Sequence, residues 1–186
     1  MAFSIEEFKG QLKGGGARPT LFDVNITSAL NLIGIASEKF RFMCKASSLP
    51  PSTIGRVPLK YFGREVPVAG DRVFGEWSVT IINDEDFIVR RAIETWMGKI
   101  NGHETNLNKF GSANPNLYKA DALINHYGKS GDTLASYQMI GLFPTNLGEI
   151  ALSWDTTDQV EEFQVTFSLD YWLPAGISAG NIPEVI

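Results

Sequence analysis

The feature of this sequence that most constrains its fold is a strict alternation of apolar and polar residues between positions 162 and 171. Successive side chains of a β-strand point to opposite faces of a sheet, so this period of two predicts a strand. The apolar residues are Phe163, Val165, Phe167, Leu169 and Tyr171, and the polar residues are Glu162, Gln164, Thr166, Ser168 and Asp170. One face is therefore expected to be buried and the other wet and acidic, as in many antiparallel sheets.

Similar patterns predict that most of the chain is β-structure. The further strands are expected over residues 21–26, 40–46, 73–82, 119–126, 134–142 and 150–154. In the segment 40–46, the residues Phe40, Phe42, Cys44 and Ala46 alternate with Arg41, Met43 and Lys45. In the segment 73–82, Val73, Trp77, Val79 and Ile81 share one face, whereas Glu76, Ser78 and Thr80 share the other.

Two helices are predicted among these strands. Ser4-Ile5-Glu6-Glu7 is a capping box for a short helix through about Leu12, followed by a hinge at Gly14-Gly15-Gly16. A longer helix is expected to start with Asn83 or Asp84 as its N-cap and with Glu85 and Asp86 near its positive end. Its stripe is Phe87, Arg90, Ile93, Met97 and Ile100, with Trp96 alongside, and Asn101-Gly102 ends it. The Asn- and Gly-rich residues 101–117 read as a loop.

Residues 50–72 are expected to form a projecting hairpin, with strands over 54–62 and 64–69 on either side of Gly63. Pro58 and Pro67 cannot donate ladder hydrogen bonds, so the hairpin is unsuited to the centre of a sheet. It is nevertheless rich in apolar side chains, and an exposed apolar element usually marks an interface.

The charge of the chain is unevenly distributed. Residues 130–186 contain eight acidic residues and no lysine or arginine, whereas the first 129 residues carry a net charge of +3. Two readings remain open: a solvated acidic face, or an acidic surface that meets a basic surface of an identical subunit or lines a passage.

Several function classes find little support. With one cysteine, Cys44, the chain cannot form an internal disulfide, and no apolar run reaches the length of a membrane span. Glu6, Glu7 and Lys9 interrupt the N-terminus, so no signal peptide is expected. His103 and His126 lack the spacing of a metal or catalytic motif, and neither a cofactor nor a metal is expected. The sequence pI of about 5.1 argues against a surface that grips nucleic acid.

Five ordered blocks of residues give a more specific indication. They are Ala17-Arg18-Pro19 with Leu21-Phe22; Cys44-Lys45-Ala46 with Leu49-Pro50; Val68-Ala69-Gly70-Asp71-Arg72 with Phe74, Trp77 and Asn83-Asp84-Glu85-Asp86; Gly141-Leu142-Phe143-Pro144-Thr145-Asn146-Leu147-Gly148-Glu149 with Trp154-Asp155; and Phe163, Val165-Thr166 and Leu169-Asp170-Tyr171-Trp172. Together they resemble the tail tube protein of contractile-tailed bacteriophages, over nearly the whole chain.

This resemblance implies a structural virion protein and no enzyme. Such proteins form hexameric rings that stack into a hollow tube through which DNA is ejected. The implied fold is an antiparallel β-sandwich or barrel-like domain over residues 1–173, with an N-terminal arm (1–20), the hairpin (50–72) and a flexible tail (174–186). The implied partners are further copies, the tail sheath, baseplate and terminator proteins, the tape measure protein and transient genomic DNA. Assembly is expected in the host cytoplasm, with the product in the virion tail.

The resemblance also assigns roles to residues. Subunit or ring contacts are expected at Ile54, Arg56, Leu59, Lys60, Tyr61, Phe62, Arg64 and Arg72. The lumen is expected to be lined by Glu76, Ser78, Thr80, Glu162, Gln164 and Thr166. One alternative is the tube of a phage-derived injection or secretion system that carries protein effectors. Another is a small soluble hydrolase that uses Asp71, Asp84 or His103.

Overall fold

The computed structural model describes residues 4–12, 16–27, 33–34, 36–110 and 114–175. Its strands are β1 (Phe22–Thr27), β2 (Cys44–Ser47), β3 (Ser52–Tyr61), β4 (Arg64–Phe74), β5 (Trp77–Ile82), β6 (Ala120–Tyr127), β7 (Thr133–Leu147), β8 (Glu162–Ser168) and β9 (Tyr171–Pro174). Its helices are α1 (Ile5–Gln11), α2 (Ala36–Met43), α3 (Ile88–Ile100) and a 3-10 turn, η2 (Pro115–Leu117). The chain is mainly β, as predicted.

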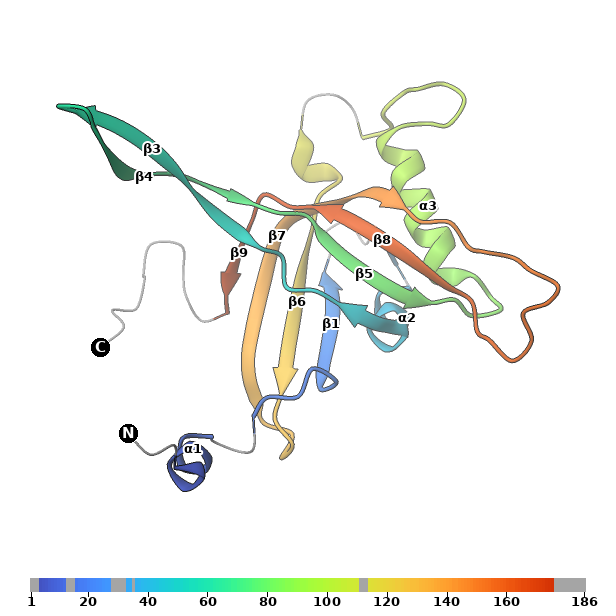
Figure 1. Ribbon diagram of the computed structural model, residues 1–186. Coiled ribbons are helices and arrows are strands. Elements are labelled where there is room, and N and C mark those ends of the chain that lie inside the picture. Colours follow the sequence, from blue (N-terminus) through green and yellow to red (C-terminus); the bar gives the residue numbers. More distant parts are fainter. Residues whose placement is uncertain (1–3, 13–15, 28–32, 35, 111–113, 176–186) are drawn as a thin grey trace.

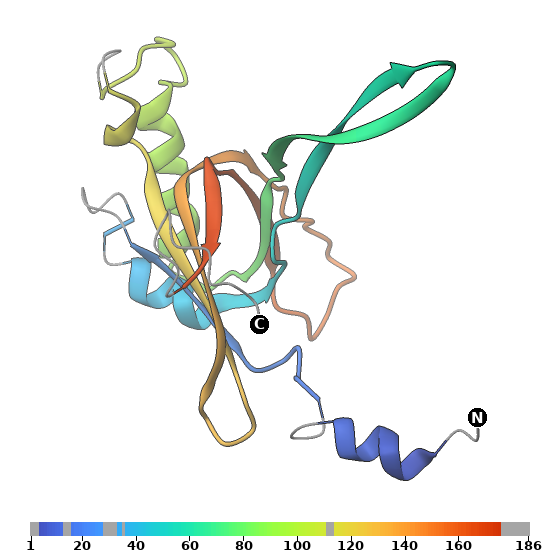
Figure 2. The ribbon, with the colours of Figure 1, turned by 90° about the vertical axis from the view of Figure 1, so that its left-hand side faces the viewer.

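Seven strands form one antiparallel sheet in the order β1-β6-β7-β8-β5-β2, with β9 also beside β7. The long strand β7 belongs to both halves of this sheet. Its first part pairs with β6 and β9, and its last part pairs with β8. The strand turns at Gly141, whose φ is +71° and whose N–H donates to an Asp121 carboxylate oxygen over 3.1 Å. The sheet consequently curls round (Figure 2), and its ends β1 and β2 approach each other without pairing in the described chain.

The curled sheet encloses a core built on large aromatic side chains. Trp77 of β5 stacks on Phe167 of β8 with ring centroids 5.2 Å apart, and Trp96 of α3 lies 6.1 Å from the same ring. Both indole N–H groups have acceptors: Trp77 donates to the Ser47 hydroxyl over 3.0 Å, and Trp96 donates to the Tyr118 carbonyl over 2.7 Å. The aromatic surface is thus buried without an unpaired indole at these two positions.

The alternation over 162–171 proves to span two strands. Phe163, Val165 and Phe167 of β8 are buried, as predicted. β8 ends at Ser168, and the Asp170 N–H then donates to the Ile140 carbonyl of β7. Tyr171 then starts β9, which pairs with β7. β9 ends at Pro174, the first residue of the predicted tail, and residues 176–186 lie outside the described chain, as do Gly14 and Gly15 of the predicted hinge.

Three predicted strands need correction. Residues 40–43 are helical, because Ala36 and Phe40 are four apart and both face the core from α2, while Phe42 is exposed. The segment 73–82 breaks at Gly75, whose N–H donates to the Pro51 carbonyl; Val73 belongs to β4 and is exposed rather than sharing the buried face of β5. Residues 150–154 form part of a long loop and not a strand.

The predicted N-caps of the two helices have different outcomes. Ser4 does cap α1, since its hydroxyl accepts the Glu7 N–H over 3.2 Å. The longer helix α3 begins only at Ile88, after Phe87 in a left-handed conformation with φ of +53°, so neither Asn83 nor Asp84 is its cap. At the start of α3, the Asp86 carboxylate accepts the Ile88 N–H over 3.0 Å.

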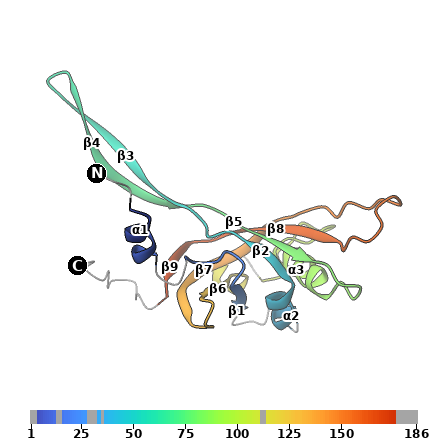
Figure 3. The ribbon, with the colours of Figure 1, turned by 60° about the horizontal axis from the view of Figure 1, so that its bottom comes forward.

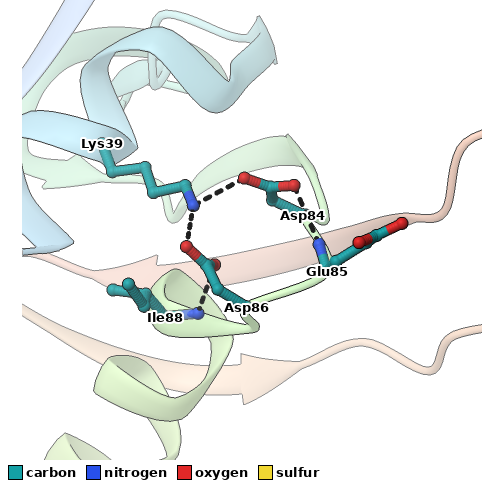
Figure 4. A network of polar contacts seen from close by, with 5 residues as sticks. All are labelled: Lys39, Asp84, Glu85, Asp86 and Ile88. Carbon is teal, nitrogen blue, oxygen red and sulfur yellow. Dashed lines mark hydrogen bonds and ion pairs between the residues drawn. The ribbon is translucent and has the colours of Figure 1, made fainter.

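The reason for this late start is an ion-pair cluster between α2 and the turn before α3 (Figure 4). The Lys39 ammonium lies 2.6 Å from an Asp84 carboxylate oxygen and also pairs with Asp86. These hydrogen bonds raise the pKa of Lys39 and lower the pKa of both aspartates. Asp84 is therefore engaged with another helix and does not reach the first turn of α3.

Candidate assembly surfaces

The β3–β4 hairpin stands clear of the curled sheet as a separate two-stranded ribbon (Figures 1 and 3). Its two strands are paired with each other from Ser52–Phe74 to Tyr61–Arg64, and Pro58 lies opposite Pro67. Neither proline occupies the middle of the main sheet, in agreement with the predicted position of the hairpin.

The turn of the hairpin and the close approach of its strands depend on glycine residues. Phe62 and Gly63 have φ of +43° and +77°, the positive pair of angles that a two-residue hairpin turn requires. A register shift between Ile54 and Arg56 places Gly55 against Gly70, where an added Cβ would lie 3.2 Å from the opposite backbone. Glycines at these two positions therefore allow the strands to approach closely.

The tip of the hairpin presents aromatic side chains to solvent. Phe62 is 91% exposed and Tyr61 is 69% exposed, with their rings edge to face at 4.6 Å. A bulky residue in the left-handed region is uncommon and costs on the order of 1 kcal/mol. This cost favours the hypothesis that the exposed Phe62 ring serves as a contact surface. Nothing in the described chain covers this surface.

The structure brings the predicted contact residues together on this one element. All of them lie on β3, β4 or the turn, and all are exposed: Ile54, Arg56, Leu59, Lys60, Tyr61, Phe62, Arg64 and Arg72. Arg56 forms an ion pair with Glu65 across the ribbon. Lys60, Arg64 and Arg72 form no ion pair within the described residues.

The second surface is the polar face of β5 and β8. Ser78 is opposite Thr166, with their hydroxyl oxygens 3.4 Å apart, and Thr80 is opposite Gln164. Glu162 ends this row opposite Ile82 and is paired with Lys45 of β2. Glu76 is exposed but lies in the Gly75-Glu76 link ahead of β5, outside the ladder. Five of the six predicted lumen residues thus share one sheet face, which is less acidic than expected because Lys45 compensates Glu162.

A third surface was missed by the sequence analysis. The loop of residues 148–161 exposes Leu152, Val160 and Trp154, and Trp154 is fully exposed. It also carries Glu149, Asp155, Asp158 and Glu161 and no basic residue. Its inner side bounds a hollow of about 650 Å³ between the loop and β2. The run Asp155-Thr156-Thr157-Asp158 has residue types that are typical of loops, and it is the sequence signal that could have predicted a loop here.

The residues examined for catalysis are scattered. Burial raises the pKa of the Cys44 thiol to about 12, so its basic neighbours do not activate it. Asp71 lies on the hairpin, His103 in the loop after α3 and His126 in β6 beside β1. Among the residues that the structure describes, no group of three His, Cys, Asp or Glu side chains is arranged to hold a metal ion. No helix of the described chain is long and apolar enough to cross a membrane.

Comparison with known proteins identifies the family to which these surfaces belong. Residues 17–174 match the family model described as phage tail tube protein. The chain is 35% identical over 160 residues to the tail tube protein gp19 of Enterobacteria phage T4, covering 86% of this chain and 92% of that protein. This chain belongs to the phage tail tube protein family. A tail tube protein of Serratia phage KSP90 is 26% identical over 163 residues, with 86% and 90% of the two chains covered.

Solved structures agree with the fold of the tail tube family. A chain from the extended sheath–tube complex of the extracellular contractile injection system PVC matches with a TM-score of 0.60 and 13% identity, covering 95% of this chain and 100% of that one. A chain from the tube-terminating cap of the anti-feeding prophage matches with a TM-score of 0.62 and 15% identity, covering 86% and 90%. The predicted fold class is confirmed, and so is a structural, non-enzymatic role as a phage tail tube protein.

Proposed function

We propose that this tail tube protein forms hexameric rings, and that the rings stack into the hollow inner tube of a contractile phage tail, through which DNA is ejected. The observation that carries the proposal is the β3–β4 hairpin, whose apolar tip is uncovered in the single subunit. Exposed apolar elements of this kind are usually buried by a partner, and in a tube the partner is another copy.

Unpaired strand edges support the same conclusion. β2 ends the main sheet, and β9 pairs only with β7 in the described chain. An open edge offers free backbone N–H and C=O groups to a neighbouring strand, so it is either protected or used for assembly. Side-by-side pairing of such edges would make a continuous wall from separate subunits. Helix α1, whose Ile5 and Phe8 are exposed, supplies a further element for contact between copies.

The polar face of β5 and β8 is the surface proposed to line the lumen. Its hydroxyl and amide groups are uncharged, and Lys45 of the neighbouring strand β2 is already paired with Glu162. DNA is held on proteins mainly through contacts between cations and phosphates. A lumen without free cations would therefore let DNA pass without retaining it.

The lumen can be tested by introducing cations there. Gln164→Lys is expected to slow or reduce DNA ejection from particles that assemble normally, because it places free ammonium groups along the passage. Glu38→Lys, an exposed change on α2, alters the net charge away from this face and serves as the control. Unchanged ejection from Gln164→Lys particles would contradict this assignment of the lumen.

The partners proposed for the tube are the tail sheath around it, the baseplate and the terminator at its ends, and the tape measure protein and DNA inside it. Assembly would take place in the host cytoplasm. A tube that carries protein effectors is the second candidate, since a chain from an extracellular contractile injection system and a chain from the tube-terminating cap of the anti-feeding prophage have a similar fold. Particles purified from the source distinguish the two, because only a phage tail is attached to a DNA-filled capsid.

Electron microscopy of the purified protein tests the central proposal. Wild-type protein is expected to form hollow tubes, either at high concentration or on added baseplates. Phe62→Asp is expected to keep the circular dichroism spectrum and melting temperature of the wild type but to form no tubes. Phe42→Asp makes the same chemical change at an exposed phenylalanine of α2 and controls for the added charge.

The proposed tube function would be refuted by wild-type protein that remains monomeric at every concentration and does not add to baseplates. Normal tube formation by Phe62→Asp would instead refute the role given to the hairpin, because it would show that the hairpin tip does not hold the tube together.

A further inference from the structure

The hairpin and the loop of residues 148–161 lie at opposite ends of the same strand pair. The hairpin strand β4 leads into β5 through Gly75 and Glu76 only, so the hairpin extends from the Trp77 end of β5. The loop leads directly into β8 at Glu162, which pairs with Ile82 at the other end of β5. Figures 1 and 3 show the two elements pointing away from each other across the molecule.

The chemistry of these two ends is complementary. The hairpin tip combines the exposed aromatic rings of Tyr61 and Phe62 with the unpaired cations Lys60 and Arg64. The loop combines exposed Leu152, Trp154 and Val160 with four acidic residues and no cation. An apolar centre with charges of opposite sign around it is the usual composition of a specific protein interface.

The loop also has a shape that suits a projecting tip. The hollow of about 650 Å³ is lined by the apolar residues Ile150, Leu152 and Val160, by polar residues of the loop, and by Glu161, Glu162 and Lys45, of which Lys45 is paired with Glu162. Phe62, at the turn of the hairpin, is its most exposed large apolar side chain. The tip of the same subunit cannot enter this hollow, because it lies at the far end of the molecule.

We propose that the loop of residues 148–161 is the docking surface for the hairpin tip of the next copy along the tube. This inference rests on the proposed function, since it assigns the contact that joins successive rings. A contact between two different surfaces of identical subunits is heterologous, and it continues without limit when it does not close on itself. Each ring would then offer hairpins at one end and acidic loops at the other, which gives the tube a direction.

Charge reversal tests the pairing of the two surfaces. Lys60→Glu with Arg64→Glu on the hairpin is expected to leave folded rings that do not stack. Asp155→Lys with Asp158→Lys on the loop is expected to have the same effect. Combining all four changes restores opposite charges, and tubes are expected to return. Normal tubes from both pairs of changes would overturn the inference.

A matched control addresses net charge. Glu38→Lys with Glu104→Lys changes the net charge by the same amount as the loop variant, at exposed positions outside both surfaces. Tubes are expected from this control under conditions in which the loop variant forms only rings. Loss of tubes in both would show that stacking responds to total charge, and would overturn the proposed contact.

Disulfide cross-linking tests proximity directly. In tubes of a Phe62→Cys, Trp154→Cys double variant, oxidation is expected to join copies into a ladder that extends beyond one ring. Each single variant is the control and is expected to give no ladder; native Cys44 is not expected to contribute, because it is half-buried in β2 and its thiol has a raised pKa. A ladder that stops at one ring would show a lateral contact, and no ladder in intact tubes would show that the surfaces do not meet.

The outcomes separate this inference from the proposed function. If wild-type protein forms tubes but neither charge reversal nor cross-linking detects the contact, the tube function stands and the docking surface is wrong. If the loop variant forms normal tubes that fail to recruit sheath, the loop is a sheath surface and the inference is again wrong. If wild-type protein forms no tubes even on baseplates, both proposals fail together.

Discussion

Replacing Gly141 with alanine is expected to destabilise the subunit by more than the cost of placing alanine at a positive φ. Gly141 lies where β7 passes from one half of the sheet to the other, with φ of +71°. A residue with a Cβ pays about 1–2 kcal/mol in the left-handed region. In addition, the new Cβ would lie 2.7 Å from Asp170 Cγ and closer still to one carboxylate oxygen.

The second contribution comes from moving Asp170. Its carboxylate oxygens accept hydrogen bonds from the Lys119 ammonium over 2.6 and 2.7 Å, and a rotation away from the new Cβ would break them. The Asp170 side chain is 48% exposed, so the loss of this pair costs at most about 1 kcal/mol. Together with the backbone cost, the expected decrease in the free energy of unfolding for Gly141→Ala is about 1–3 kcal/mol, of which up to about 1 kcal/mol comes from the displaced Asp170.

Gly131 provides the matched control. It has φ of +87°, but an added Cβ would meet nothing within 4 Å, so Gly131→Ala should show the backbone cost alone. In an Asp170→Ala background, the cost of Gly141→Ala should fall towards the Gly131→Ala value, since the obstructing carboxylate is gone. Urea unfolding followed by circular dichroism, at concentrations too low for assembly, measures all of these variants.

Two results would refute the role given to Asp170. If Gly141→Ala and Gly131→Ala cost the same in the wild-type background, then Asp170 does not constrain the turn of β7. If removing Asp170 leaves the cost of Gly141→Ala unchanged, the close approach is likewise not the cause.

Three further outcomes are expected. Phe167→Ala, which removes the ring between the two core tryptophans, should lower the free energy of unfolding by about 3–5 kcal/mol, whereas Phe62→Ala at the exposed tip should change it by less than about 0.5 kcal/mol. Lys39 lowers the pKa of its two aspartate partners below 3.8, so the stability they provide is present above that pH and lost as the pH falls through the folded-state values. The stability advantage of wild type over Lys39→Met should therefore shrink between about pH 5 and pH 2 in thermal melts, and a constant difference would contradict it. Because the pKa of Cys44 is about 12 rather than 9.0, its alkylation at pH 8 should be about a thousandfold slower in the folded protein than in urea, and equal rates would contradict its burial.

Local patterns predicted the elements that hold the core and the hairpin. The buried residues Phe163, Val165 and Phe167 follow from the period of two, and the hairpin turn follows from Gly63 between two apolar runs. Both signals are contained within a few neighbouring residues. For this reason they could be interpreted before any contact across the chain was known.

The failures occur where a distant contact competes with a local preference. Asp84 is a good helix cap by residue type, but it pairs with Lys39 of α2 and the helix starts later. The alternation that includes Phe40 also fits a helix, because Ala36 one turn earlier is buried on the same face. A short apolar run does not distinguish strand from helix until its packing partners are known.

The sequence by itself determined which side chains of β5 and β8 are buried, where the hairpin turns and that the C-terminal third carries the acidic charge, because period, turn residues and charge are local properties. Only the tertiary structure decided that β7 serves both halves of the sheet and that the acidic loop lies at the opposite end of β5 and β8 from the basic hairpin. Strand order and register depend on hydrogen bonds between residues far apart in the chain, and those pairings determine which surfaces of one copy can meet another.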